Sequence, residues 1–84
     1  MDYIKQCTGV RIKEPNCLVY YFKDEPSAEA AYRDLMCDSE MRVAKPTVGL
    51  SGQTEILILY PKKLSIHKVA SVFTEAFNIP LYKD

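Results

Sequence analysis

The sequence predicts an α+β domain made of two consecutive strand–strand–helix units, and two observations support this fold class. The apolar segment 17–22 is followed by a helical stripe at residues 28–36, and the same order recurs with the apolar segment 56–61 and the stripe 66–77. A continuous or alternating apolar segment is typical of a strand, whereas apolar residues three and four positions apart are typical of a helix. Because 84 residues suffice for one core, we expect a single domain over residues 1–84.

The first unit begins with a predicted hairpin. Residues 3–12 are expected to form a strand that is interrupted by Gly9 and carries Ile4, Val10 and Ile12 on one side of the pleat. The segment Glu14-Pro15-Asn16 has turn chemistry, since proline presets one backbone dihedral and asparagine tolerates a left-handed conformation. The second strand is then expected at 17–22.

A helix is predicted to follow this hairpin. Asp24, Pro26 and Ser27 are residues that favour the start of a helix. We expect the helix to end near residues 37–39.

The second unit repeats the pattern with a weaker first strand. Residues 41–50 suggest a strand, but Pro46 cannot donate a hydrogen bond within a sheet, which predicts an edge position or a bulge. A turn at 51–53 leads to the most apolar strand, 56–60. Ser65 is expected to cap the second helix and Asn78 to end it, with 81–82 as a short edge strand or a segment that packs back.

This order of elements predicts a four-stranded, mostly antiparallel sheet with both helices on one face, a two-layer sandwich of the ferredoxin-like type. Strands covered on one side only should alternate apolar and polar residues, yet 17–22 and 56–60 are apolar throughout. The second face of the sheet would then be exposed and available to a partner. Alternatively, the helices divide between the two faces, or residues 81–82 fold over the open side.

The predicted interaction surface is this uncovered sheet face. Tyrosine suits protein interfaces, because its ring gives contact area and its hydroxyl group can donate a hydrogen bond. A homodimer is the simplest arrangement, since two identical faces bury each other under two-fold symmetry. The candidate partner-binding residues are Tyr20, Tyr21, Leu57, Leu59 and Tyr60.

A second candidate surface is the basic start of the second helix, where cations oppose the helix dipole. Free amides and nearby lysines at a helix N-terminus suit an anion or a nucleic-acid phosphate, although the lysines can equally be solvated. Arg42 and Lys45 would extend the patch if the third strand lies alongside. The candidate anion-binding residues are Lys62, Lys63, Ser65, His67 and Lys68.

Other classes of function receive little support from the sequence. The three cysteines lack the close spacing of zinc ligands, so we expect reduced thiols, no metal and no cofactor. The single histidine would have to serve any nucleophile, and no glycine-rich phosphate loop is present, which disfavours an enzyme. A net charge of zero disfavours bulk nucleic-acid binding, and the start has no signal-peptide pattern. We therefore expect a cytoplasmic, non-enzymatic interaction module of the adaptor or inhibitor type.

Overall fold

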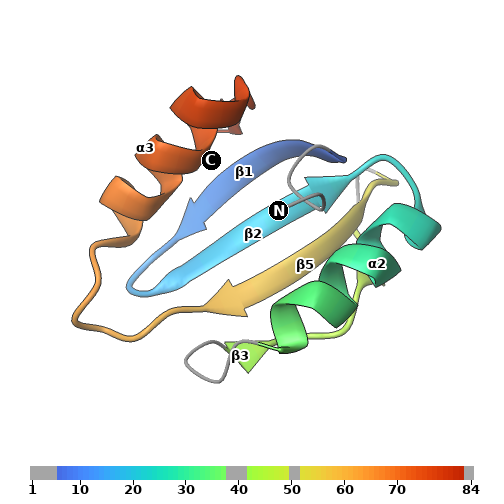
Figure 1. The fold of residues 1–84 in the computed structure, drawn as a ribbon, viewed down its shortest axis with the longest axis horizontal. Coiled ribbons are helices and arrows are strands. Elements are labelled where there is room, and N and C mark those ends of the chain that lie inside the picture. The colour runs from blue at the N-terminus through green and yellow to red at the C-terminus, as the bar shows by residue number, and fades with distance from the viewer. Residues whose placement is uncertain (1–5, 38–41, 50–51, 83–84) are drawn as a thin grey trace.

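The computed structural model describes residues 6–37, 42–49 and 52–82, which form a sheet with two helices (Figure 1). In chain order the elements are β1 (Cys7–Lys13), β2 (Cys17–Phe22), α2 (Glu25–Met36), β3 (Arg42–Val43), β4 (Thr47–Val48), β5 (Thr54–Leu59), α3 (Ile66–Phe77) and β6 (Leu81–Tyr82). The α+β class is therefore confirmed. Of the predicted elements, residues 3–5 of the first strand, residues 38–39 after the first helix, residues 41 and 50 of the third strand and residue 51 of the turn lie outside the described residues.

The sheet is mixed and larger than predicted. Its order is β3-β5-β2-β1-β6, with β4 also paired to β5, and every described pair is antiparallel except β1 with β6. The four-stranded, ferredoxin-like arrangement is thus not confirmed. Two physical causes explain the difference. The predicted third strand is interrupted around Pro46 and pairs with β5 as two short pieces. Residues 81–82 form a short edge strand on β1, which is one of the two outcomes predicted for them.

The edge position of the interrupted strand follows from its backbone. Ala44 still donates a hydrogen bond from its amide to the carbonyl of Leu57 (2.9 Å), so the segment stays close to β5 between β3 and β4. Pro46 has no amide hydrogen to donate, and regular pairing resumes only at Thr47. The prediction of an edge strand at Pro46 is confirmed.

Short local signals fix the ends of both helices. The carboxylate of Asp24 accepts a hydrogen bond from the Ser27 amide (2.9 Å) at the start of α2. The hydroxyl of Ser65 accepts one from the Lys68 amide (3.4 Å) at the start of α3. Asn78 ends α3 in the left-handed conformation, with φ of 55°. These three capping roles agree with the sequence prediction.

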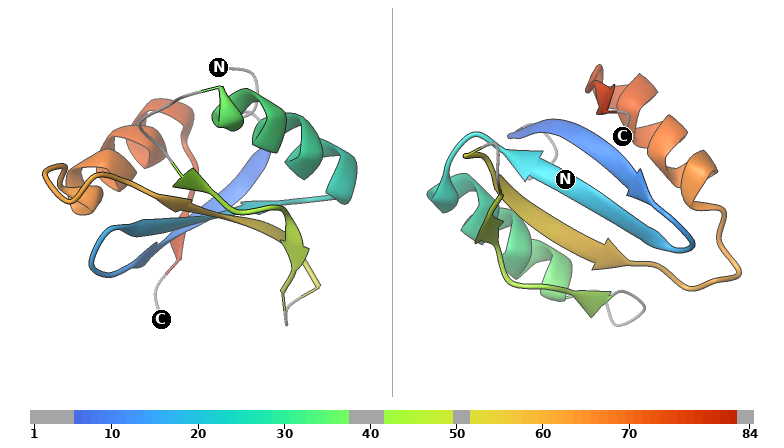
Figure 2. Two further views of the ribbon diagram at one scale, coloured as in Figure 1. Left: turned by 90° about the horizontal axis from the view of Figure 1, so that it is seen from below. Right: turned by 180° about the vertical axis from the view of Figure 1, so that it is seen from behind.

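Both helices cover the same face of the sheet (Figure 2). Small residues of α2, Ala28 and Ala31, are fully buried, which allows the helix to approach the sheet closely. On the sheet side, the fully buried residues of this layer are Val10, Leu18, Tyr20, Phe22, Ile56 and Ile58. The core therefore lies between the helices and one face of the sheet, and neither of the two described helices lies over the opposite face.

Candidate functional site

The helix-free face is defined by the register of the three long strands. Side chains of a strand alternate between the two faces, and Tyr20 of β2 lies in the core, so its neighbours Val19 and Tyr21 point the other way. Val19 pairs with Arg11 of β1 on one side and with Leu57 of β5 on the other. The same register places Lys13, Cys17, Leu59 and Arg42 on this face.

Two predicted surface residues lie elsewhere. Tyr20 is fully buried and meets Phe73 of α3 edge-on, with ring centroids 6.0 Å apart. Tyr60 is also buried in the core, and the hydroxyl oxygens of the two tyrosines are 3.1 Å apart. Their predicted exposure is corrected, because their positions in the strand alternation direct both rings under the helices. Of the predicted set, Tyr21, Leu57 and Leu59 lie on the helix-free face. Tyr21 is buried there as well, so its predicted exposure is also corrected, whereas Leu59 is exposed.

The end of this face near β6 is covered by the chain itself. The ring of Tyr82 meets the ring of Tyr21 edge-on at 5.2 Å. The Arg11 guanidinium donates a hydrogen bond from Nε to the Tyr21 hydroxyl (2.9 Å), and the Tyr82 hydroxyl donates one to the carbonyl of Thr8 (3.2 Å). The alternative prediction, that the C-terminal segment folds over the open side, is therefore correct at this end.

The other end of the face contains an apolar depression of about 310 Å³, which we call the β3–β5 hollow. Leu59 at this site is 43% exposed, whereas Cys17 is buried. The lining residues are Cys17, Arg42, Val43, Ala44, Leu57 and Leu59. Except for Arg42 they are apolar, so the hollow can accept an apolar side chain while its margin carries a positive charge.

A second, more polar depression of about 220 Å³ adjoins the first, and we call it the cationic recess. It is lined by Asn16, Arg42, Leu59, Tyr60, Pro61 and Lys62. Because Arg42 and Leu59 belong to both depressions, the two form one continuous surface. Asn16 is held in place by exchanging hydrogen bonds with the Tyr60 backbone (2.9 and 2.8 Å), which ties the β1–β2 turn to the end of β5.

The two buried thiols are poor nucleophiles. Burial raises the pKa of Cys17, and the nearby charges of Lys13 and Arg11 lower it again only in part. Burial likewise raises the pKa of Cys7, which belongs to the core. Since the thiolate is the reactive form, both cysteines are mainly protonated and unreactive near neutral pH.

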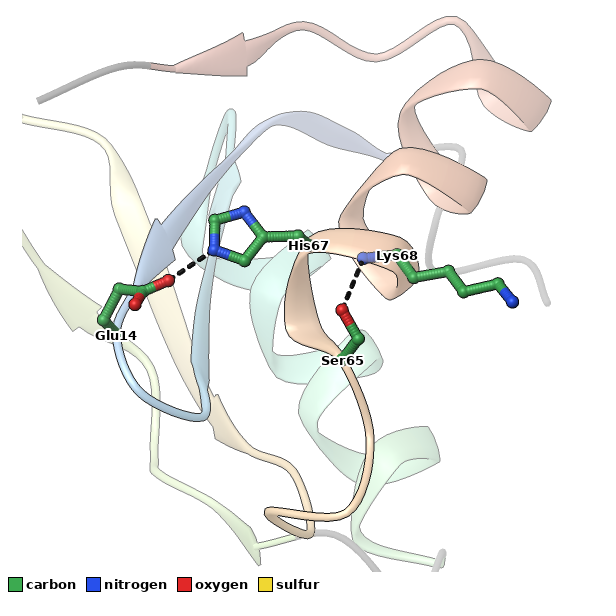
Figure 3. Close-up of polar contacts among 4 residues, drawn as sticks. All are labelled: Glu14, Ser65, His67 and Lys68. Atoms are coloured by element: carbon green, nitrogen blue, oxygen red, sulfur yellow. Dashed lines mark hydrogen bonds and ion pairs between the residues drawn. The ribbon is translucent and has the colours of Figure 1, made fainter.

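The predicted basic helix end does not converge on one point. Ser65 uses its hydroxyl to cap α3, and the exposed imidazole of His67 pairs with the carboxylate of Glu14 from the β1–β2 turn (Figure 3). The Lys68 side chain extends away from both contacts in Figure 3. A carboxylate thus occupies the position beside His67 where a bound anion would be expected.

Lys62 instead lines the cationic recess together with Arg42, whereas Lys45 is not among the residues that line it. Nothing in the described residues tests whether Lys63 binds an anion, and that role remains a prediction.

Within residues 6–37, 42–49 and 52–82, no group of three or more histidine, cysteine or acidic side chains is placed to hold a metal ion. None of the described helices has the length and apolar character needed to cross a membrane.

Comparisons with protein-family models, curated proteins and solved structures find no significant match. The class of protein must therefore be inferred from the geometry of the helix-free face.

Proposed function

We propose that this chain is a non-enzymatic protein-interaction module, of the adaptor or inhibitor type, that binds its partner through the helix-free face of the sheet. The observation that supports the proposal is the β3–β5 hollow, an apolar depression beside a leucine that is 43% exposed. Protein interfaces are commonly anchored by a few apolar side chains in such depressions, surrounded by polar groups.

The chemistry of the described residues favours binding over catalysis. The single histidine, His67, is exposed at the start of α3 and contacts the carboxylate of Glu14. Cys17, which lines the hollow, has a raised pKa and is therefore a weak nucleophile. Neither residue has the arrangement that an activated nucleophile and its base require.

Self-association is one form of this function, and it stays a prediction. A symmetric, face-to-face dimer would bring the helix-free faces of two copies together. Lys13 and Arg42 flank that face, so each copy would present like charges to the other. Like charges in apposition disfavour a complex, and a different protein is therefore the better-supported partner.

Nucleic-acid or anion binding is the second candidate, because Arg42 and Lys62 line the same recess. Phosphate contacts make affinity fall steeply with salt. This candidate predicts salt-sensitive binding of a single-stranded oligonucleotide that weakens in Lys62→Glu and Lys63→Glu.

The proposed function is tested by placing a charge in the hollow. Leu59→Glu should abolish partner binding, since a carboxylate in an apolar anchor site must be desolvated without a matched group. The matched control is Val72→Glu, because Val72 is a 57% exposed apolar residue of α3, on the other side of the molecule. Circular dichroism should show both variants folded.

Two measurements decide the outcome. Light scattering of the purified chain reports self-association, and a quantitative pull-down from host extract compares wild type with both variants. Loss of a bound protein, or of a dimer, in Leu59→Glu but not in Val72→Glu supports the proposal. Binding that is identical in wild type and Leu59→Glu refutes it.

A further inference from the structure

We infer that the partner is an acidic protein segment that places one large apolar side chain in the β3–β5 hollow and its carboxylates in the cationic recess. This inference rests on the proposed function and specifies the chemistry of the partner. It follows from three features of the surface: the size of the hollow, the sign of the surrounding charge and the continuity of the two depressions.

The hollow is suited to a side chain rather than to a whole small molecule. Pockets that enclose small ligands measure about 300–1,000 Å³ and bury most of the ligand. At about 310 Å³ the hollow is at the lower limit of that range, and it is bordered by Leu59, which is itself 43% exposed. A leucine, isoleucine, methionine or phenylalanine side chain would fit within the hollow and contact Leu59.

The charge around the hollow is positive. Arg42 lines the hollow and Lys62 lines the adjoining recess. Lys13 lies on the same face, on β1, where it pairs with Cys17 of the hollow. Among the described residues of this face, Glu55 of β5 is the acidic one, and it pairs with Tyr21 towards the covered end. A partner with carboxylates therefore meets complementary charge, whereas a basic partner is repelled.

The two depressions share Arg42 and Leu59, which sets the spacing of the partner's groups. An apolar side chain seated against Leu59 would have its neighbouring residues beside Arg42 and Lys62. A guanidinium group can bind a carboxylate through two parallel hydrogen bonds, which makes Arg42 the stronger of the two contacts. The expected motif is thus one apolar residue adjacent to one or two aspartates or glutamates.

The same surface is poorly suited to nucleic acid. Single-stranded nucleic acids bind by stacking their bases on exposed aromatic rings. On this face the ring of Tyr21 is buried, and it already meets the ring of Tyr82 edge-on. The surface between Arg42 and Lys13 is aliphatic, so phosphate contacts would lack accompanying stacking.

Selection from a library of random displayed peptides, with the purified full chain as bait, tests the inference. The enriched peptides should contain an apolar residue next to aspartate or glutamate. Their affinity, measured by fluorescence anisotropy of labelled synthetic peptides, should fall with salt. It should also fall about tenfold or more in Arg42→Glu, because the hydrogen bonds between the guanidinium and the peptide carboxylate are lost and a like charge takes their place.

A charge exchange gives the sharpest control. Arg42→Glu should recover affinity for a peptide whose acidic residues are replaced by lysine, whereas wild type should not bind that peptide. Arg33→Glu is the matched control, because this exposed arginine lies on α2 and outside both depressions, and it should leave affinity unchanged. Recovery that also occurs in Arg33→Glu would overturn the inference.

Cys17 provides a direct readout of occupancy. In a Cys37→Ser background and at alkaline pH, where the buried thiols begin to ionise, the bound peptide should slow alkylation of Cys17, which lines the hollow. It should leave the alkylation of Cys7 in the core unchanged. A peptide that binds without protecting Cys17 lies elsewhere and would overturn the inference.

The possible results separate the inference from the proposed function. Neutral or basic peptides that still require Leu59 overturn the acidic partner but leave the interaction face intact. Peptides insensitive to both Leu59→Glu and Arg42→Glu overturn both proposals. Tighter binding of a single-stranded DNA oligonucleotide than of any selected peptide overturns the acidic segment in favour of nucleic acid.

Discussion

Replacement of Gly9 by alanine tests how the C-terminal strand is attached to the sheet. A methyl group at Gly9 would overlap the Tyr82 ring. It would lie 2.8 Å from the Tyr82 hydroxyl oxygen, which is closer than van der Waals contact. The φ of Gly9 lies outside the left-handed region, so alanine itself causes no backbone strain there. The substitution therefore acts mainly by displacing the Tyr82 ring.

The cost follows from the contacts that the ring would lose. The edge-on contact with Tyr21 at 5.2 Å contributes about 0.5–1.5 kcal/mol. The hydrogen bond from the Tyr82 hydroxyl to the Thr8 carbonyl contributes about 0.5–1.5 kcal/mol. Alanine restricts the unfolded chain and returns about 0.4–1 kcal/mol. We expect Gly9→Ala to lower the free energy of unfolding by about 0.5–2 kcal/mol, or several degrees in Tm for a domain of this size.

Urea unfolding of four proteins decides the question: wild type, Gly9→Ala, Tyr82→Ala and the double variant. If the ring contact is the cause, the double variant should be at least as stable as Tyr82→Ala, because no ring remains to be displaced. Costs that simply add in the double variant would refute this reasoning, since alanine at position 9 would then destabilise the fold independently of Tyr82.

Three further predictions concern stability and reactivity. Ile58→Ala removes a fully buried core side chain and should lower the free energy of unfolding by about 2–5 kcal/mol. Leu59→Ala changes the next residue, which is 43% exposed, and should lower the free energy of unfolding much less. Chemical denaturation of both variants measures the difference. Hydrogen bonds from the side chain and the backbone amide of Ser27 lower the pKa of Asp24. These hydrogen bonds therefore stabilise the folded state fully when the pH is above 3.8, the ordinary pKa of the aspartate side chain. The stabilisation is lost as the pH falls through the lower pKa that Asp24 has in the folded state. The Tm difference between wild type and Asp24→Ala should accordingly narrow in acid, and a difference that widens would contradict the sign. Iodoacetamide should modify the exposed Cys37 well before the buried Cys17. The alkylation rate of Cys17 should still be rising at pH 9, because burial raises its pKa. Mass spectrometry follows both reactions, and equal rates would refute this order.

The sequence was sufficient to predict the long strands, both helices and their caps, because each depends on local patterns. Residues 17–22 are apolar throughout, however, and such a run does not reveal which side chains face the helices. The information was present in the first hairpin, where Arg11 and Lys13 mark the outer face of β1. Pairing through the turn at 14–16 gives the same outward direction to Val19 and Cys17, and so assigns Tyr20 to the core.

The candidate site was less predictable than the fold. Leu57 and Leu59 were identified from the apolar excess of β5, but the hollow also needs Cys17, Arg42 and Ala44, which come from separate segments. Their proximity depends on the sheet order, in which β5 lies between β2 and β3. Non-local pairing of this kind leaves no periodic signal in the sequence. The likeness between the two halves also concealed the different ends of the sheet, where a broken strand lies on one side and a parallel strand on the other.

The interruption around Pro46 bears on how the protein behaves at high concentration. Outer strands with continuous unpaired amides can recruit strands from other molecules, and proline and lysine at an edge oppose this growth. Here Pro46 and the exposed Lys45 lie where β3 and β4 leave the outer border of the sheet irregular. The strongly apolar β5 is thereby shielded from amyloid-like stacking, and replacing Pro46 by valine would be expected to make the chain prone to fibril formation.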